Sequence, residues 1–206
     1  MTGPKTDTSK TIDYYFSVFS PWTYFGDKRF RDLAQKYGFK VRHHPQLSPV
    51  LFPATGGLAL KDRAEPRKAY RMMELERWRE HLGININLTP KFFPVPEAPA
   101  SKLILAALDA GQEVGELTHA LGRATWEEER DISDAATLID IATACGLDGV
   151  ALLEASMDES YDKALNDEAQ SAIERGVFGY PTYAVGDDLF WGQDRLDFLE
   201  RALQKA

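Results

Sequence analysis

An alternating apolar pattern near the start of the chain constrains the fold more than any other feature. Apolar side chains at every second position of residues 12–18 predict a β-strand with one buried face. Ser20 then has the chemistry of a helix N-cap, and Pro21 suits the first helical position. We expect this helix to end at Gly38, before a second strand at residues 39–44. The result is a strand–helix–strand unit, whose crossover is right-handed in nearly all proteins.

The middle of the chain changes to a helical pattern. Residues 48–66 and 85–99 are rich in proline and glycine and predict irregular connections. Pro66 starts a helix that Gly83 ends, and Ser133 suits the cap of a later helix. The further helices are predicted at residues 100–110, 113–130, 133–145 and 158–175.

The end of the chain returns to β character. Residues 181–185 and 189–191 flank a GDD turn and predict a hairpin, followed by an amphipathic helix at 194–206. This order predicts an α/β protein, a thioredoxin fold with an all-helical domain inserted after the second strand. We expect the N-terminal part of the thioredoxin fold at residues 11–47, the helical insertion domain at 48–175 and the C-terminal part at 176–206.

Charge and composition exclude several classes of partner. The 206-residue chain carries a formal net charge of −8, which disfavours binding to the phosphate backbone of nucleic acids. No apolar run approaches the roughly 20 residues that span a bilayer, so we expect no membrane partner. Residues 1–10 are polar and lack the apolar region of a secretory signal. We therefore expect a disordered tail and a cytoplasmic protein.

The cysteine and histidine content limits redox and metal chemistry. Cys145 is the single cysteine, which excludes a CxxC pair and with it a dithiol oxidoreductase. Its place at a predicted helix end is typical of an inert thiol. His43 and His44 close the second strand, but no further ligands stand at metal-binding spacing. We expect no metal and a structural role for both. His81 and His119 lie on predicted helices without a partner motif.

Pro181 stands where a thioredoxin fold places a proline, directly before its third strand. The peptide bond of that proline is cis and faces the N-terminus of the first helix. We therefore expect a cis Tyr180–Pro181 bond, although few X–Pro bonds in proteins are cis. Such a bond would turn the backbone N–H and C=O of Tyr180 outward, toward an extended peptide-like ligand.

Four motifs carry a resemblance to a known family. "FSPWTY", "PRKAY", "GVFGYPTYAV" and "DDLFWGQDRLDFL" occur in this order from about residue 19 to residue 199. Together they resemble the 2-hydroxychromene-2-carboxylate isomerase family, which is close to the kappa-class glutathione transferases and related to DsbA-like proteins. The resemblance implies glutathione as cofactor, a small-molecule substrate, a homodimer and a place in aromatic compound catabolism.

The resemblance also implies roles for individual residues. Ser20 would hydrogen-bond the glutathione sulfur, where redox relatives carry cysteine. Its hydroxyl and the positive end of the helix dipole would both favour thiolate over thiol. The alternative for Ser20 is a simple N-cap. Gln193 and Asp194 would hold the γ-glutamyl end, with the Asp194 carboxylate pairing with the ammonium group and helix-start N–H groups taking the carboxylate. The alternative for these two residues is helix capping.

The remaining implied contacts come from Tyr180 and Lys68. The backbone of Tyr180 would pair with the cysteinyl amide, and Lys68 in "PRKAY" would face the glycyl carboxylate. A lysine on a helix is equally well explained as a solvated surface residue. One position departs from the family: many relatives have "TGN" where this chain has "TGG", so Gly57 lacks a side-chain contact to glutathione.

The implied activity is a glutathione-dependent cis–trans isomerisation. Glutathione thiolate adds reversibly to an unsaturated carbon, a bond rotates, and glutathione is regenerated on release. Aromatic residues near the predicted site would suit a ring-bearing substrate, although aromatics are more often core: Trp22, Phe52, Phe92 and Phe93. Two alternatives stay open, a kappa-like glutathione transferase that releases a conjugate and a non-catalytic glutathione-binding module.

Overall fold

A four-stranded mixed sheet organises the molecule. The computed structural model describes residues 10–205, so most of the predicted N-terminal tail lies outside the described residues. The strand order is β2-β1-β3-β4. β1 pairs in parallel with β2 and antiparallel with β3, and β3 pairs antiparallel with β4. The strands are β1 (Thr11–Phe16), β2 (Lys40–Pro45), β3 (Thr182–Val185) and β4 (Asp188–Trp191).

All other secondary-structure elements of the described chain are helices. The elements between β2 and β3 are helices alone, as the sequence predicted. Two short 3-10 helices are η2 (Leu60–Asp62) and η3 (Gln193–Arg195). The α-helices are α1 (Pro21–Tyr37), α2 (Ser48–Thr55), α3 (Glu65–Leu82), α4 (Ala98–Asp109), α5 (Gly115–Trp126), α6 (Ala135–Ala144), α7 (Gly149–Ser156), α8 (Ser160–Glu174) and α9 (Leu196–Leu203).

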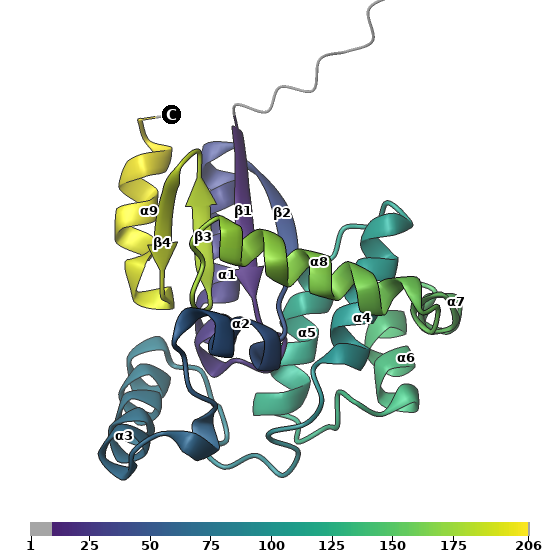
Figure 1. Cartoon of the computed structure of the whole chain (residues 1–206), viewed down its shortest axis with the longest axis horizontal. Helices are drawn as coiled ribbons and strands as arrows, with labels where there is room; N and C mark the ends of the chain where they lie inside the picture. The colour runs from purple at the N-terminus through teal and green to yellow at the C-terminus, as the bar shows by residue number, and fades with distance from the viewer. Residues whose placement is uncertain (1–9, 206) are drawn as a thin grey trace, which may run out of the picture.

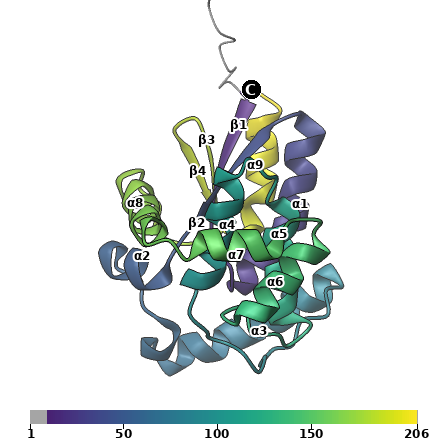
Figure 2. The same cartoon turned by 90° about the vertical axis from the view of Figure 1, so that its right-hand side faces the viewer.

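The thioredoxin-fold arrangement is clear in two views. Helix α8 covers one face of the sheet, while α1 and α9 cover the other (Figure 1, Figure 2). Helices α4 to α7 lie beside the sheet at the β2 edge (Figure 1). One continuous apolar core joins the sheet to these helices, because buried side chains of β1, α1, α4 and α5 belong to a single cluster. The exact domain boundaries stay a prediction.

The structure corrects several local predictions. Residues 48–66 were expected to be irregular, yet Ser48–Thr55 form α2 despite Pro53 inside the helix. Burial of Leu51, which is fully shielded from solvent, supports this helix against the loss of one backbone hydrogen bond. Helix α7 was also not predicted. Asp134 rather than Ser133 caps α6, because its carboxylate accepts from the Thr137 N–H at 2.9 Å.

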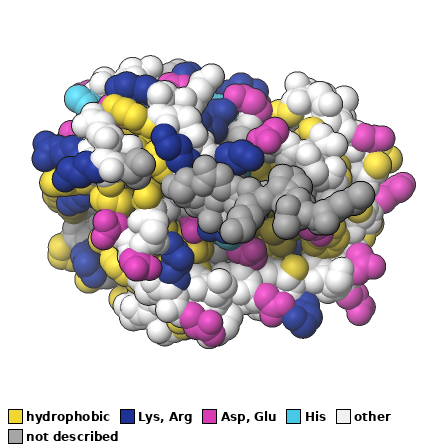
Figure 3. Space-filling model, turned by 90° about the horizontal axis from the view of Figure 1, so that it is seen from above, with side chains coloured by type: hydrophobic (Ala, Val, Ile, Leu, Met, Phe, Trp, Pro, Cys, Tyr) yellow, Lys and Arg dark blue, Asp and Glu magenta, His cyan; other side chains and the backbone are white. Residues whose placement is uncertain are grey.

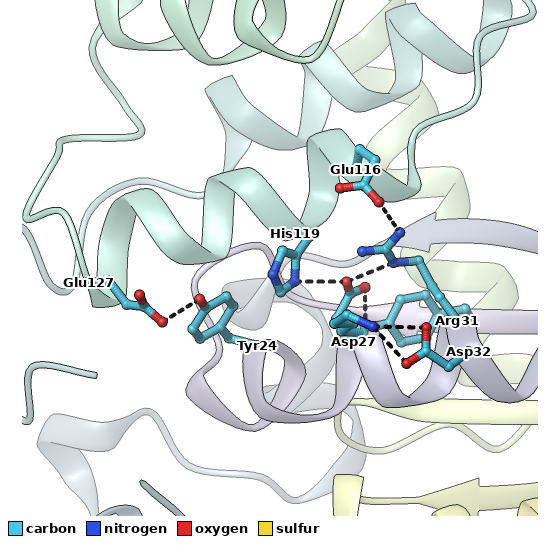
Figure 4. A network of polar contacts seen from close by, with 9 residues as sticks. Tyr24, Asp27, Arg31, Asp32, Glu116, His119 and Glu127 are labelled. Carbon is cyan, nitrogen blue, oxygen red and sulfur yellow. Dashed lines mark hydrogen bonds and ion pairs between the residues drawn. The ribbon is translucent and has the colours of Figure 1, made fainter. Parts of the chain in front are cut away.

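A buried carboxylate ties α1 to α5. Asp27 is 1% exposed and accepts hydrogen bonds from Arg31 Nε at 3.0 Å and from Tyr14 Oη at 3.4 Å. His119 on α5 contacts the same carboxylate at 3.1 Å, which supplies the partner that the sequence had not revealed (Figure 4). Arg31 also pairs with Glu116 on α5 at 2.6 Å. Asp27 is therefore paired and hydrogen-bonded on several sides, as a buried charge requires.

Charged side chains on the surface are mixed in sign. On the face seen from above, acidic and basic groups are interspersed rather than gathered into one basic field (Figure 3). Over residues 10–205, no helix is both long and apolar enough to cross a membrane. The same residues contain no group of three or more His, Cys, Asp or Glu side chains arranged to hold a metal ion.

His44 is the centre of a second ionic cluster, between the sheet and α8. Its Nδ1 lies 2.8 Å from Glu168 and its Nε2 lies 3.1 Å from Asp13. Burial alone would lower the pKa of His44, but the hydrogen bonds to Asp13 and Glu168 prevail and raise it to about 9. His44 is therefore charged at neutral pH and has the structural role that the sequence suggested.

The His44 cluster should make stability pH-dependent. Because the folded-state pKa is raised, its contribution is fully present below the unfolded pKa and is lost as pH rises through about 9. We expect the difference in unfolding free energy between wild type and His44→Gln to be largest near pH 6 and to shrink by about 3 kcal/mol by about pH 10. Urea unfolding at both pH values measures it. His81→Gln, at an exposed histidine, is the control and should show no such change. A pH-independent difference for His44→Gln would contradict the assignment.

Candidate functional site

The predicted site residues converge at one end of the sheet. Tyr15 on β1 pairs with Thr182 on β3, so the end of β1 and the start of β3 lie at the same edge. The turn that leads to Ser20 therefore lies beside Pro181. The Tyr180–Pro181 bond is cis, which confirms the sequence prediction. Helix α2 lies across this end of the sheet, with α3 beyond it (Figure 1).

Ser20 caps α1 and keeps a free proton. Its Oγ accepts from the Thr23 N–H at 3.3 Å, and its backbone N–H donates to Ser17 O at 3.1 Å. The side chain is nearly buried, with 7% exposed. Among the described residues, no acceptor takes the hydroxyl proton of Ser20. Ser20 is thus an N-cap and can also donate to a ligand atom at the positive end of the α1 dipole.

Tyr180 presents an unpaired backbone next to the cis bond. Within the described chain, neither its N–H nor its C=O takes part in a hydrogen bond. Its ring stacks on Phe52 of α2, with 5.3 Å between centroids, and its hydroxyl donates to Ser48 Oγ at 2.6 Å. These contacts hold the side chain inward and leave the backbone available for a peptide-like ligand.

Gln193 and Asp194 lie in η3, beside both Pro181 and α1. The Gly192 N–H donates to Pro181 O at 2.8 Å, which joins the start of η3 to the cis proline. Gln193 is buried, and its Oε1 accepts from Arg29 of α1 at 2.8 Å. The Asp194 carboxylate is about half exposed and pairs with Arg195 at 2.7 Å. Neither residue caps α9 through its side chain, so the capping alternative finds no support for Asp194.

Lys68 already has an ion-pair partner, which the sequence analysis did not consider. It lies on the second turn of α3, where its Nζ pairs with Glu65 at 2.8 Å. A carboxylate ligand would have to compete with that partner. Gly57 also has a structural explanation, since a Cβ there would lie 2.8 Å from the Phe52 ring. An asparagine at this position would displace the ring that stacks on Tyr180.

Glu97 is a feature of the site that the sequence analysis missed. This residue is 5% exposed and precedes α4. It accepts a short hydrogen bond from Ser17 Oγ, one from the Ser48 N–H at 2.7 Å and one from Ser48 Oγ at 3.1 Å. It therefore links the turn that carries Ser20 to the Ser48–Tyr180 pair. The only signal in the sequence was a single acid within an apolar, proline-rich stretch.

Glu97 forms no ion pair with any cation of residues 10–205. Burial raises its pKa to about 7, against the opposing effect of the hydrogen bonds from Ser17 and Ser48. Near neutral pH the group is thus divided between its acid and its carboxylate.

The aromatic residues surround this end of the sheet from two sides. Phe93 contacts Phe19, the residue before Ser20, with 5.4 Å between ring centroids. Phe52 covers Tyr180 on the other side. Trp22 packs against Phe25 within the cluster that joins α1 to α3. Cys145 is half-buried, and burial raises the pKa of its thiol, in keeping with an inert residue.

Three polar groups lie at this site: a free hydroxyl at a helix N-terminus, an unpaired backbone beside a cis proline and a partly exposed carboxylate. These are the kinds of group that interact with a thiol, an amide and an ammonium group. Asp194 and Lys68 would each have to leave an ion-pair partner to meet a ligand, and Gly57 offers no side chain. Fold and site together define a thioredoxin-fold protein with serine at the start of the first helix.

Comparison with known proteins identifies the family. Residues 11–204 match the DSBA-like thioredoxin domain. The chain is 33% identical to 2-hydroxychromene-2-carboxylate isomerase of Sphingobium xenophagum, over 95% of this chain and 98% of that protein. It is 22% identical to glutathione S-transferase kappa 1 of Caenorhabditis elegans, over 94% and 91%. A solved structure of a 2-hydroxychromene-2-carboxylate isomerase superposes with a TM-score of 0.82 at 25% identity, over 95% of both chains.

This chain therefore belongs to the DsbA-like thioredoxin family. It is an enzyme of the group whose members are named isomerase and glutathione transferase. The non-catalytic module considered from the sequence is accordingly set aside. The homodimer and the cytoplasmic location stay predictions.

Glu97 generates a second pH-dependent prediction. Its folded-state pKa is raised, so its contribution to stability is present at low pH and is lost as pH rises through about 7. Glu97→Gln keeps the size and removes the charge: its amide oxygen can accept from the Ser48 N–H, while its NH2 group donates to the hydroxyls of Ser17 and Ser48, which then accept. We expect this variant to gain stability relative to wild type by a few kcal/mol between about pH 5 and pH 8. Chemical denaturation at both pH values tests it, with the exposed Glu113→Gln as control. If the unfolding free energies of wild type and Glu97→Gln differ by the same amount at about pH 5 and about pH 8, the raised pKa of Glu97 is refuted.

Proposed function

We propose that this enzyme is a glutathione-dependent isomerase that acts on an unsaturated, aromatic-derived small molecule. The observation that carries the proposal is Ser20, which combines a free hydroxyl proton with the N-terminus of α1 beside the unpaired backbone of Tyr180. Similarity to 2-hydroxychromene-2-carboxylate isomerase over nearly the whole chain supports the same activity class. When bound, glutathione supplies a thiolate that can add reversibly to an electrophilic carbon.

The role of Ser20 is to stabilise that thiolate. Its O–H donates to the sulfur, and the partial positive charge of the α1 N-terminus lowers the energy of the anion. The backbone N–H of Trp22, in the first turn of α1, has no acceptor among the described residues. It lies at the N-terminus of the helix, as Ser20 does. Ser20 is not itself the nucleophile.

The other site residues position the tripeptide. The Tyr180 N–H and C=O pair with the cysteinyl amide, while Asp194 exchanges its partner Arg195 for the γ-glutamyl ammonium group. Gln193, held by Arg29, takes part at the same end of the ligand. Lys68 reaches the glycyl carboxylate only if it leaves Glu65. Positioning of this kind brings the sulfur to about 3–3.5 Å from the reacting carbon.

A kappa-like transferase is the second candidate, favoured by the similarity to glutathione S-transferase kappa 1. The two activities differ in the fate of glutathione. An isomerase returns it unchanged after each turnover, whereas a transferase consumes one molecule for each product. Incubation with a cis-configured unsaturated aryl ketone, followed by quantification of free glutathione and of the trans isomer, separates them. Loss of one glutathione for each ketone consumed, with a glutathione conjugate as product and no trans isomer, would overturn the isomerase assignment.

Ser20→Ala tests the thiolate role. The variant should raise the pKa of the bound glutathione thiol and slow the reaction about 10- to 150-fold, because one hydrogen bond to a charged group is lost. It should also cost about 1 kcal/mol of stability as a lost cap. A titration of thiolate absorbance with glutathione bound measures the pKa.

The matched control is Asp148→Ala, which removes the N-cap of α7 far from the site. It should lower stability by a similar amount and leave the titration unchanged. If Ser20→Ala gives the wild-type titration curve and rate, Ser20 is only a cap.

Asp194→Ala tests glutathione binding. Loss of a charge-assisted hydrogen bond to the γ-glutamyl ammonium group should weaken affinity by roughly 2–3 kcal/mol. Calorimetry with glutathione measures the change. The control is Asp187→Ala, at an exposed acid in the hairpin turn between β3 and β4, which should bind as wild type does. Equal affinities of Asp194→Ala and wild type would remove Asp194 from the site.

A further inference from the structure

Arg71 is a half-buried cation without an anionic partner. It lies on α3 and forms an ion pair with no carboxylate in the described part of the chain. Its only hydrogen-bond acceptor there is the weak Sδ of Met72, at 3.8 Å. Burial and the neighbouring Arg63 lower the pKa of Arg71 to about 10. Arg77 on the same helix, by contrast, pairs with Glu74 at 2.6 Å. Desolvating a charge without a partner costs free energy, so such a group is a candidate for ligand binding.

Arg63 repeats this pattern close by. It is also half-buried and also lacks an ion pair among the described residues. Its Nε donates to the backbone oxygen of Leu58 at 3.0 Å. Burial and the nearby Arg67 lower its pKa. The charge of Arg63 also lowers the pKa of Arg71, so the two like charges repel each other, and an anion that contacts both would relieve this repulsion.

Each guanidinium lies over an aromatic ring that borders the site. Arg71 is 5.6 Å from the ring centroid of Phe93, which contacts Phe19 next to Ser20. Arg63 is 5.9 Å from the centroid of Phe52, which stacks on Tyr180. The two cations therefore border the site on the same two sides as the aromatic residues. A guanidinium is planar by itself, and contact with a ring face holds it in place while its N–H groups stay free to donate.

We propose that Arg71 and Arg63 form a carboxylate-binding subsite beside Ser20. Guanidinium groups bind carboxylates through paired N–H donors, and the flanking rings suit a planar, ring-bearing acid. The carboxylate that binds there belongs either to the acceptor molecule or to the glycyl end of glutathione. Lys68 is already paired with Glu65, whereas neither Arg71 nor Arg63 has an ion pair among the described residues. The inference rests on the proposed function only for the identity of the neighbouring thiol.

The first experiment measures binding without turnover and without glutathione. Cinnamate and its neutral analogue cinnamamide are titrated into the full-length protein by calorimetry. We expect wild type to prefer cinnamate and Arg71→Gln to lose about 10- to 150-fold in cinnamate affinity, with little change for cinnamamide. Arg63→Gln should show the same selectivity, and Arg71→Lys should retain part of the affinity. The control, Arg77→Gln, should behave as wild type does.

The second experiment separates the two sources. Glutathione and its glycyl ethyl ester are titrated into wild type and Arg71→Gln. If Arg71→Gln weakens glutathione but not the ester, the subsite takes the glycyl carboxylate. If it weakens only cinnamate, the subsite takes the acceptor. Removal of an unpaired, half-buried charge should leave the thermal unfolding midpoint of Arg71→Gln no lower than that of wild type.

The proposal is overturned if Arg71→Gln binds both cinnamate and glutathione as wild type does. It is also overturned if the variant weakens cinnamate and cinnamamide equally and glutathione and its glycyl ester equally, because no carboxylate would then be recognised. These outcomes are distinct from failure of the proposed function. A protein that binds cinnamate through Arg71 but does not bind glutathione would retain the subsite and lose the glutathione-dependent activity. A protein that binds glutathione with no carboxylate dependence on either arginine would retain the activity and lose the subsite.

Discussion

The antiparallel pairing of β1 with β3 is the constraint on which the site depends. It joins the first strand to a strand near the C-terminus, across the helical region between them. Because Tyr15 is opposite Thr182, the turn that leads to Ser20 must lie next to the cis bond before Pro181. Both faces of β1 are buried, with Tyr14 and Phe16 in the main core and Tyr15 in a second apolar cluster. A change of register by one residue would exchange these two faces and disrupt both clusters. Packing on the two faces of β1 therefore fixes the geometry of the site.

Over residues 10–205, buried charged side chains of the structural core have partners of opposite charge, whereas several polar groups of the candidate site lack partners. Away from the site, Asp27 is buried beside Arg31, and the partly buried His44 lies between Asp13 and Glu168. These pairs of opposite charge stabilise the contacts between the sheet and the helices. At the site, the Ser20 proton, the Tyr180 backbone and Arg71 have no such partners among the described residues. Unpaired polar groups are costly inside a protein, and a ligand that pairs with them recovers part of that cost. This difference is the physical basis on which we separate structural from functional residues.

Glu97 connects the helical region to the candidate site. It lies at the start of α4, in the helical region, and reaches the turn after β1 and the start of α2 through Ser17 and Ser48. Ser48 in turn accepts from Tyr180. A single buried carboxyl thus holds three segments that are distant in sequence, and its protonation state changes which hydrogen bonds it can make.

Local sequence signals were sufficient for the thioredoxin-fold elements. Helix α1 begins at Pro21 and ends before Gly38 as predicted, because the N-cap, the proline and the left-handed glycine are all local features. Both predicted strand pairs and the cis Tyr180–Pro181 bond were also confirmed. Helix α2 was missed because its prolines indicate an irregular segment, whereas burial of Leu51 against distant residues stabilises a helix.

The sequence by itself determined which residues were candidates, through Ser20 at a helix start, Pro181 before a strand and Asp194 before the last helix. Only the tertiary structure decided which charges are paired. Lys68 pairs with Glu65, three residues away on the same helix. Glu74 stands at the same spacing from Arg71 but pairs with Arg77, so Arg71 has no ion pair among the described residues. The sequence spacing alone does not distinguish these two cations, because the partner that each side chain takes and its desolvation depend on the packing around it. The sequence determines which charged and polar groups the protein has, but the packing of the whole fold determines the electrostatic environment of each group.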